Sequence, residues 1–261
     1  FGVGVALLRG ITDRSIHNPL EVVGRLGVRV LGSIEHIHAD ALASGLDARL
    51  IEPIRGISTT LLATSPKRTA QSRLITSPTA GSGKSSMSMN LCRSLAATGR
   101  RVLLIDADNQ GQGSTRRLSL AGRLGLPEYL DGMPASDLIQ KISANFDMLP
   151  SGPRNDSFGD ALRAKGALDR LRALYQDYEE VIVDSPPLLV KSDAIALATM
   201  VDEVILVLRA GRTTHQEAQL ARQYLDSVRG NVVGVILNAV DAKTARYGYG
   251  YSYAYASSES T

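Results

Sequence analysis

The segment LITSPTAGSGKSS, residues 74–86, has the residue types and the order of a phosphate-binding loop. A strand-like run leads into small residues, then into Gly83-Lys84-Ser85, and then into a helical pattern, which is the context that such a loop requires. Glycines let backbone N–H groups face a polyphosphate without a Cβ in the way, and the positive end of the following helix attracts the anion. We expect Lys84 to reach the β and γ phosphates and the Ser85 hydroxyl to bind Mg²⁺. The residues predicted to contact the nucleotide are Gly81, Ser82, Gly83, Lys84, Ser85 and Ser86.

Two further strand-like runs end in aspartate. RVLLIDADNQG places Asp106 and Asp108 at the carboxyl end of an apolar strand, the edge at which open α/β sheets bind ligands. Residues two apart on an extended chain point the same way, so one carboxylate can position Mg²⁺ while the other accepts a proton. Asp184 ends the strand of EEVIVDSPP and is placed to supply a second Mg²⁺ contact, usually through water. Turn-forming aspartates that only cap strands are the alternative, but three motifs in this order favour a catalytic site.

Strand-like and helical runs alternate regularly after residue 70. Several strand-like runs are apolar on consecutive residues, which is typical of strands buried on both faces of a mainly parallel sheet. The alternation predicts an α/β fold like that of P-loop NTPases, with helices on both faces, and we assign this ATP-binding domain to residues 71–240. The predicted strands are SRLITS, RVLLID, NFDMLP, EEVIVDSPP, DEVILVLRA and VVGVILNAV, and the main predicted helices are SSMSMNLCRSLAATG, GALDRLRALYQDY and TTHQEAQLARQYLDSV.

The first 70 residues form a region of shorter elements. Residues 1–15 begin with eight apolar or glycine residues, fewer than the roughly 20 that span a bilayer, and Arg9 and Arg14 follow. We interpret this segment as the end of a membrane helix and its cytoplasmic juxtamembrane residues; a short buried strand is the alternative. The elements expected in the next region, residues 16–70, are a helix after Asn18-Pro19, a strand from Val28 to Ile34 and helical spacing over 46–63.

The composition is that of a globular protein with a modest positive charge. The chain has 261 residues, 44% hydrophobic and 21% charged, which allows a sizeable core. Its one cysteine, Cys92, excludes an intramolecular disulfide framework, and its apolar helical surroundings predict a small buried side chain. The net charge of +3 does not require a nucleic-acid partner, and we predict none. Lys191, Arg209 and Arg212 are either phosphate guides or ordinary surface charges.

The three motifs, in this order, resemble those of the bacterial tyrosine kinases of capsule and exopolysaccharide export. SPTAGSGKSS, LLIDAD and VIVDSPP are similar to the family's phosphate loop, its Asp-x-Asp motif and its third motif. The resemblance implies ATP and Mg²⁺ as cofactors, Asp106 as the group that activates a tyrosine hydroxyl, and Asp108 and Asp184 as groups that hold Mg²⁺ together with Ser85. It also implies that Asn238, after a later buried strand, lies near the adenine.

The same resemblance implies partners and a location. Such kinases lie on the cytoplasmic face of the bacterial inner membrane, joined to a membrane and periplasmic co-polymerase region. They form homo-oligomers, in some cases rings, act with the polysaccharide export machinery, and are reversed by a cognate tyrosine phosphatase. NPLEVVGRLGVRVLGSI is similar to the segment that follows their second membrane helix. In the ring-forming Glu-x-x-Arg-x-x-Arg helix, Glu52 and Arg55 fit, but Ser58 replaces the second arginine and Pro53 is expected to interrupt the helix.

Other departures keep two alternative functions open. DADNQGQGST is also similar to the Asp-x-Asp-Pro-Gln-Gly of partition and division-site ATPases, which suggests a switch ATPase. That class has a second lysine where Thr79 stands, however, and Pro78 replaces the first glycine of the strict phosphate-loop pattern. Gln110 stands where the kinases often have arginine, which, with Ser58, suggests a degenerate kinase that serves as a scaffold of the export complex.

The chain ends in YGYGYSYAYASSEST, which we assign to a flexible tail over residues 241–261. Small residues between the tyrosines leave no core for the tail to pack against. The resemblance implies that a neighbouring subunit phosphorylates these tyrosines. Five phosphates would add roughly −8 to −10 charges, which exceeds the net charge of the chain and predicts a looser assembly. An edge strand with all phenols on one face is the alternative. The predicted phosphorylation sites are Tyr247, Tyr249, Tyr251, Tyr253 and Tyr255.

Overall fold

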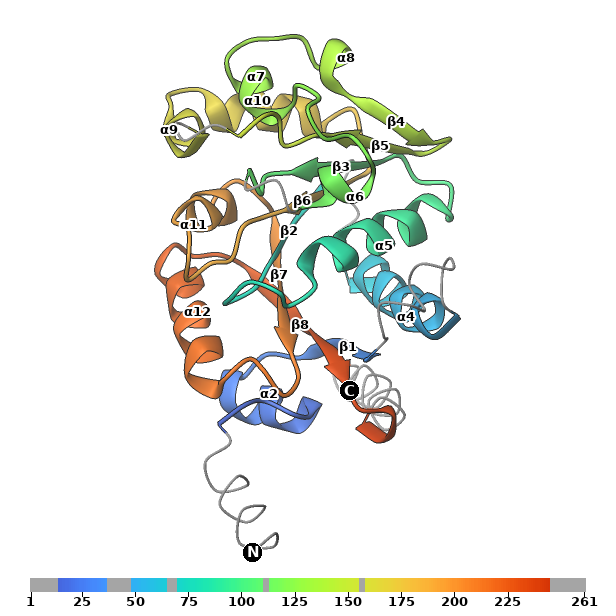
Figure 1. Cartoon of the computed structure of the whole chain (residues 1–261), viewed down its shortest axis with the longest axis vertical. Coiled ribbons are helices and arrows are strands. Elements are labelled where there is room, and N and C mark those ends of the chain that lie inside the picture. The colour runs from blue at the N-terminus through green and yellow to red at the C-terminus, as the bar shows by residue number, and fades with distance from the viewer. Residues whose placement is uncertain (1–13, 37–47, 65–69, 110–112, 155–157, 245–261) are drawn as a thin grey trace, which may run out of the picture.

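The computed structural model describes residues 14–36, 48–64, 70–109, 113–154 and 158–244, which are built around one sheet (Figure 1). Within these ranges the sheet has eight strands in the order β1-β8-β7-β2-β6-β3-β5-β4. Neighbouring strands are parallel except β4 and β5, which are antiparallel. The strands are β1 (Val30–Glu35), β2 (Gln71–Thr76), β3 (Val102–Asp106), β4 (Gln140–Ser143), β5 (Phe146–Leu149), β6 (Glu180–Asp184), β7 (Glu203–Arg209) and β8 (Val232–Val240).

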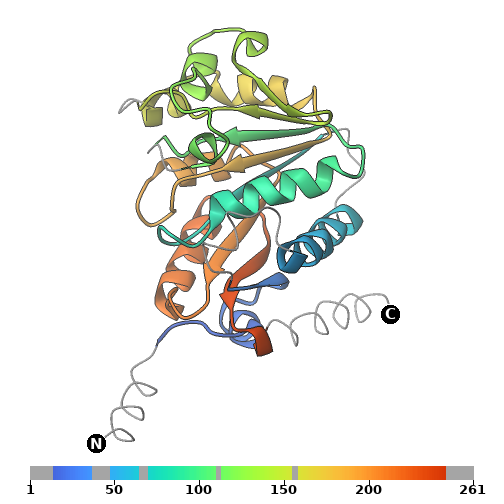
Figure 2. The same cartoon turned by 45° about the vertical axis from the view of Figure 1, so that its right-hand side comes forward.

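Helices cover both faces of the sheet (Figures 1 and 2). On one face α4 and α5 pack side by side over a core that includes Ile75 and Ile205. On the other face α2 and α9 to α12 contribute to a core that includes Leu74 and Leu206. The α/β prediction with a mainly parallel sheet is confirmed. The helices are α2 (Pro19–Leu26), α4 (Ala48–Thr64), α5 (Lys84–Ala96), α6 (Ser114–Arg117), α7 (Leu126–Leu130), α8 (Ala135–Leu138), α9 (Phe158–Arg163), α10 (Ala167–Tyr175), α11 (Asp193–Ala198) and α12 (His215–Ser227).

The runs of consecutive apolar residues predicted the strands well, because most of these strands are buried on both faces. All six predicted runs contain a strand, and the earlier one begins at Val30 rather than Val28. The pattern missed β4, a four-residue edge strand that is half exposed and so carries no apolar run. Cys92 is fully buried on α5, as predicted.

Two local signals in the first region had different outcomes. The helix expected after Asn18 forms, and the Asn18 side chain caps it by accepting a hydrogen bond from the Glu21 N–H at 3.1 Å. The expectation that Pro53 interrupts its helix is wrong, since α4 runs through it. Pro53 is buried, and the apolar face of α4 packs on β1 and α5, so tertiary packing outweighs the hydrogen bond that proline removes.

The amino-terminal region shares the sheet of the later domain. β1 pairs in parallel with β8 at one edge, so the boundary predicted at residue 70 remains a prediction, and the sheet includes strands from both sides of it. Of the predicted membrane segment, residues 1–13 lie outside the described residues. None of the helices that the structure describes is both long and apolar enough to cross a membrane.

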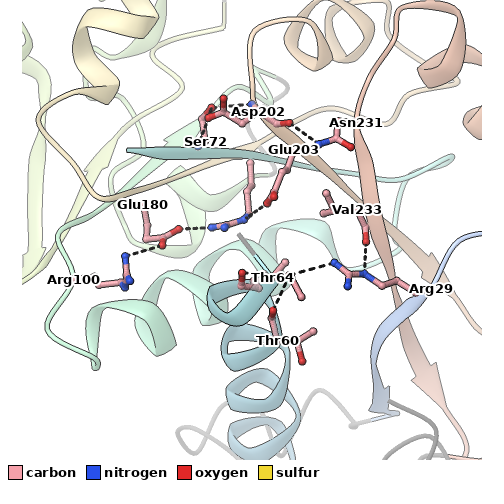
Figure 3. Close-up of polar contacts among 12 residues, drawn as sticks. Arg29, Thr60, Thr64, Ser72, Arg100, Glu180, Asp202, Glu203, Asn231 and Val233 are labelled. Carbon is pink, nitrogen blue, oxygen red and sulfur yellow. Dashed lines mark hydrogen bonds and ion pairs between the residues drawn. The ribbon is translucent and has the colours of Figure 1, made fainter. Parts of the chain in front are cut away.

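A buried ion cluster lies at the amino ends of the central strands. Arg73 on β2 is fully buried, its Nε donates to Glu203 Oε2 at 2.7 Å, and its Nη1 donates to Glu180. Arg100 donates to the other oxygen of Glu180 at 3.2 Å (Figure 3). Burial raises the pKa of Glu180, and the charge of Arg73 opposes the shift. These charges are tolerated in the core because each has a partner.

We therefore expect Arg73→Met to lower the free energy of unfolding by about 3–5 kcal/mol, because it leaves a buried carboxylate without its partner. Adding Glu203→Gln should recover part of this loss, since it removes the orphaned charge. Urea denaturation at pH 7 measures both effects. Arg222→Met, which removes an exposed ion pair with Asp226, is the matched control and should change stability by about 0.5 kcal/mol or less. An equal loss in both arginine variants would contradict a stabilising role for the buried cluster.

Candidate nucleotide and catalytic site

The loop between β2 and α5, residues 77–83, has the backbone geometry that its glycines allow; we call it the phosphate loop. Gly81 and Gly83 have φ angles of 77° and 96°, in the left-handed region that favours glycine. A Cβ at Gly83 would lie 2.3 Å from the Asn238 side-chain nitrogen, so a larger residue does not fit there. Gly83 is the N-cap of α5 and no side chain caps it, which leaves the first N–H groups of this helix available to an anion.

Side chains from the far end of the sequence hold this loop from outside. The Arg209 Nη1 at the end of β7 donates to the Gly81 carbonyl at 2.8 Å, and the Asn238 Nδ2 on β8 donates to the Ser82 carbonyl at 2.9 Å. The Arg212 guanidinium also lies close to the loop: a Cβ at Gly81 would be 3.1 Å from its Nη1. Of the three cations considered from the sequence, two therefore lie at the loop, and Lys191 is exposed after the third motif.

The first residues of α5 face the carboxylates. Lys84 is buried, and burial lowers the pKa of its amine, while the negative charges of Asp184 and Asp108 oppose the shift. Ser85 is half-buried, and its hydroxyl lies close enough to the Asp184 carboxylate to oppose the rise in its pKa. Ser86 is half-buried in the same turn. The structure therefore brings a lysine, a hydroxyl and carboxylates from three different motifs together at one edge of the sheet.

Asp106 and Asp184 are direct neighbours, because β3 and β6 are paired and these two residues are in register. Both carboxylates are fully buried. Burial, and then the charge of Asp184, raise the pKa of Asp106 to about 7, against hydrogen bonds from the N–H groups of Thr115 and Asp108. Burial also raises the pKa of Asp184. Two like charges this close in the core favour a shared proton near neutral pH.

A short turn that the sequence analysis missed holds both carboxylates. The Ser114 hydroxyl donates to Asp184 Oδ2 at 2.7 Å, and the Thr115 N–H donates to Asp106 Oδ2 at 2.6 Å. A Cβ at Gly113 would lie 2.6 Å from Asp106 Oδ1, so the turn packs directly on the carboxylate. Gly113-Ser114-Thr115 has the residue types of a helix start, which was the available signal, but the sequence does not show that this turn folds back on its own strand.

Other predicted residues lie at the margin of the site or outside the described residues. Asp108 is mostly buried at the end of the Asp-x-Asp segment. Ser58 is buried against α5, with its Oγ 2.8 Å from that of Ser94. Gln110 and the five tail tyrosines are outside the described residues.

The raised pKa of Asp106 predicts how stability depends on pH. The ordinary pKa of this carboxyl is 3.8, so between about pH 4 and 7 the folded chain binds more protons than the unfolded chain. The free energy of unfolding should therefore fall as the pH rises through this window, by on the order of 1 kcal/mol or more, and Asp184 acts in the same direction. Urea denaturation at pH 5 and pH 8, without nucleotide or metal, measures this change.

Asp106→Asn should reduce that pH dependence, because asparagine does not titrate. Asp160→Asn, at an exposed aspartate in the first turn of α9, is the control and should keep the wild-type pH dependence. If wild type and Asp106→Asn lost the same stability between the two pH values, the carboxyl would not be titrating as its surroundings require.

Comparisons with known proteins show which family the chain resembles. Residues 74–248 match the family of the CobQ/CobB/MinD/ParA nucleotide binding domain. The tyrosine-protein kinase YwqD of Bacillus subtilis is 32% identical over 202 residues, which cover 76% of this chain and 84% of YwqD. The putative tyrosine-protein kinase EpsB of Ralstonia solanacearum is 32% identical over 267 residues, which cover 95% of this chain and 35% of EpsB.

The structural comparison gives the same family. The kinase domain of the Escherichia coli tyrosine kinase ETK superposes with a TM-score of 0.76 at 28% identity, covering 85% of this chain and 94% of that domain. The family resemblance expected from the three motifs is therefore confirmed. The chain belongs to the bacterial tyrosine-protein kinases, within the CobQ/CobB/MinD/ParA nucleotide-binding family.

Proposed function

We propose that this chain is an ATP-dependent protein tyrosine kinase that phosphorylates its own carboxyl-terminal tyrosines. The observation that carries the proposal is the buried Asp106, which has a pKa of about 7. It lies beside Asp184, and Lys84 and Ser85 at the start of α5 approach Asp184. The chain spans 84% of YwqD but 35% of EpsB, so the activity, substrates and partners of the longer relatives come to it only as proposals.

In this proposal the phosphate loop and Lys84 bind the triphosphate. The backbone N–H groups at the start of α5 face the phosphates, and the Lys84 ammonium approaches the β and γ phosphates. Gly81, Ser82, Gly83 and Ser86 complete the loop contacts, and Asn238 contributes from the Ser82 side.

The residues around Asp184 fit a Mg²⁺ ion. Asp184 Oδ1 is buried and has no hydrogen-bond partner among the described residues, and oxygen ligands of this kind are those that Mg²⁺ prefers. Ser85, Asp108 and Asp184 would hold it, and the Ser85 hydroxyl lies near enough to Asp184 to affect the pKa of that carboxyl. When bound, Mg²⁺ supplies positive charge against the phosphate oxygens.

Asp106 is the proposed proton acceptor. A tyrosine hydroxyl has a pKa near 10, so its deprotonation at neutral pH needs a positioned base, and a carboxylate with a pKa near 7 is well matched to that task. The hydroxyl proton goes to Asp106, the phenol oxygen forms a bond to the γ phosphorus, and the bond between that phosphorus and ADP breaks. Ser114 and Thr115 keep the two carboxylates in place during this transfer.

The proposed substrate is the tyrosine cluster of a neighbouring copy. Fully extended, a tail of 15 residues reaches on the order of 50 Å, which is far enough to enter the site of another subunit. We propose a homo-oligomer on the cytoplasmic face of the membrane that regulates exopolysaccharide or capsule export and is reversed by a tyrosine phosphatase. Glu52 and Arg55 are exposed on α4, whereas Ser58 is buried against α5, so subunit contacts on this helix would rest on the first two.

Intact mass before and after addition of ATP and Mg²⁺ tests the kinase proposal. We expect mass increases of one phosphate each, located by fragmentation to Tyr247–Tyr255. Lys84→Met and Asp106→Asn should each lower the rate at least 100-fold, because they remove the phosphate-binding cation and the base. Lys141→Met, at an exposed lysine on β4, is the control and should keep the wild-type rate.

Mixing two variants tests transfer between subunits. A Lys84→Met chain with its tail intact should gain phosphate from a chain whose five tail tyrosines are replaced by phenylalanine. ATP hydrolysis without any phosphotyrosine would favour the switch ATPase, and ATP binding without turnover would favour the scaffold.

Phosphorylation should also weaken self-association. Each fully phosphorylated tail gains roughly −8 to −10 charges, so tails of neighbouring subunits repel one another within an assembly. Sedimentation or light scattering of the unphosphorylated and fully phosphorylated forms, at several concentrations and two ionic strengths, measures the effect. We expect a smaller mass for the phosphorylated form, with the difference reduced at high salt. Identical masses throughout would contradict the electrostatic argument.

A further inference from the structure

Two consecutive carbonyl groups of the phosphate loop accept hydrogen bonds from side chains of β7 and β8. Arg209 binds the Gly81 carbonyl and Asn238 binds the Ser82 carbonyl. The described chain has no cis peptide bond, and in a trans peptide the C=O and the next N–H point in opposite directions. Fixing these two carbonyls therefore aims the N–H groups of Ser82 and Gly83 toward the opposite side, where the helix begins.

Arg209 is itself held by the turn that follows β7. The Arg209 N–H donates to the Thr213 hydroxyl at 2.9 Å, and the Thr213 N–H donates back to the Arg209 carbonyl at 2.9 Å. The Ala210 N–H donates to the Asn238 carbonyl at 2.8 Å, so the two residues that bind the loop are also joined to each other. Thr213 is buried, so one end of the turn is held in the protein interior.

Residues 14–16 in turn bind the outer side of this turn; we call them the clamp segment. The Ile16 N–H donates to the Thr213 carbonyl at 2.8 Å, and the Gly211 N–H donates to the Ile16 carbonyl at 2.9 Å. The His215 N–H donates to the Arg14 carbonyl at 3.0 Å, and Ser15 forms an antiparallel bridge with Thr214. The Ile16 side chain is fully buried, in the same core cluster as Val22 of α2 and Ala218 of α12.

We propose that Arg209 is a positioning residue for nucleotide binding and that the clamp segment acts through it. Arg209 holds the Gly81 peptide so that the next N–H faces the phosphates, and Ile16 keeps the 209–213 turn where Arg209 reaches that carbonyl. Without the clamp segment, the turn keeps its internal bonds between Arg209 and Thr213 and its bond to Asn238. It loses the two backbone hydrogen bonds to Ile16, and the adjoining His215 N–H loses its bond to Arg14. The inference rests on the assignment of the phosphate loop as a nucleotide site, not on transfer to tyrosine.

The effects of Ile16 and Arg209 on the phosphate loop should be coupled. If Ile16 affects the phosphate loop only through Arg209, then the loss of ADP affinity caused by Ile16→Ala should disappear once Arg209 is already replaced. A general loosening of the fold would instead lower affinity by the same factor in both backgrounds. Double-mutant cycles separate these cases.

The experiment is calorimetric titration of the full chain with Mg-ADP, for wild type, Arg209→Ala, Ile16→Ala and the double variant. We expect each single variant to weaken ADP binding about tenfold and the double variant to be no weaker than Arg209→Ala. Arg209→Lys keeps one donor for the Gly81 carbonyl and should recover affinity to within about threefold of wild type. Arg222→Ala, an arginine on α12 paired with Asp226, is the control and should bind like wild type.

Either of two results would overturn the proposal. Arg209→Ala with wild-type ADP affinity would show that the bond to Gly81 does not position the loop. Equal factors for Ile16→Ala with and without Arg209 would show that the clamp segment does not act through this arginine. Thermal unfolding of each variant identifies one that fails to fold; if Ile16→Ala does so, Ile16→Val takes its place in the cycle. Because ADP affinity is measured, a chain without kinase activity can still satisfy or fail this test.

Discussion

The constraint on which the rest of the structure depends is the burial of two carboxylates side by side at the end of β3 and β6. Asp106 and Asp184 are in register on paired strands, and both are fully buried, so water does not screen their charges. Such a pair is unfavourable in a core unless donors surround it. Those donors are the Ser114 hydroxyl and the N–H groups of Thr115 and Asp108, and the nearby cation is Lys84. The phosphate loop, the turn after β3 and the strand order all serve to bring these groups together.

The sequence predicted the parts of this arrangement that are local. Apolar runs that end in aspartate indicate parallel strands whose carboxyl ends meet, and a glycine-rich turn before a lysine indicates the loop between β2 and α5. The sequence did not predict contacts between distant residues that lack a repeating pattern. Arg209 reaches Gly81 over 128 positions and Asn238 reaches Ser82 over 156, and neither spacing has any periodicity.

Weak local signals failed for a related reason. Pro53 argues against a helix when its neighbours alone are considered, but the buried face of α4 determines the outcome. β4 is short and half exposed, and only its pairing with β5 identifies it as a strand. The turn at Gly113 has ordinary helix-start residues, and its role depends on folding back over Asp106, which a linear pattern does not encode. Tertiary packing, rather than propensity, decided each of these elements.

The placement of buried charge separates stability from chemistry within one strand. β6 begins with Glu180 and ends with Asp184, and both carboxylates are removed from water. At the amino end, Arg73 and Arg100 compensate the charge of Glu180. At the carboxyl end, Asp184 lies beside another carboxylate, and one of its oxygens has no hydrogen-bond partner among the described residues. An unfavourable arrangement of this kind persists only where the surrounding fold enforces it, and it lies at the edge where parallel sheets bind their ligands. The incomplete compensation at Asp184 therefore supports the proposed site at this end of the sheet more directly than any single motif does.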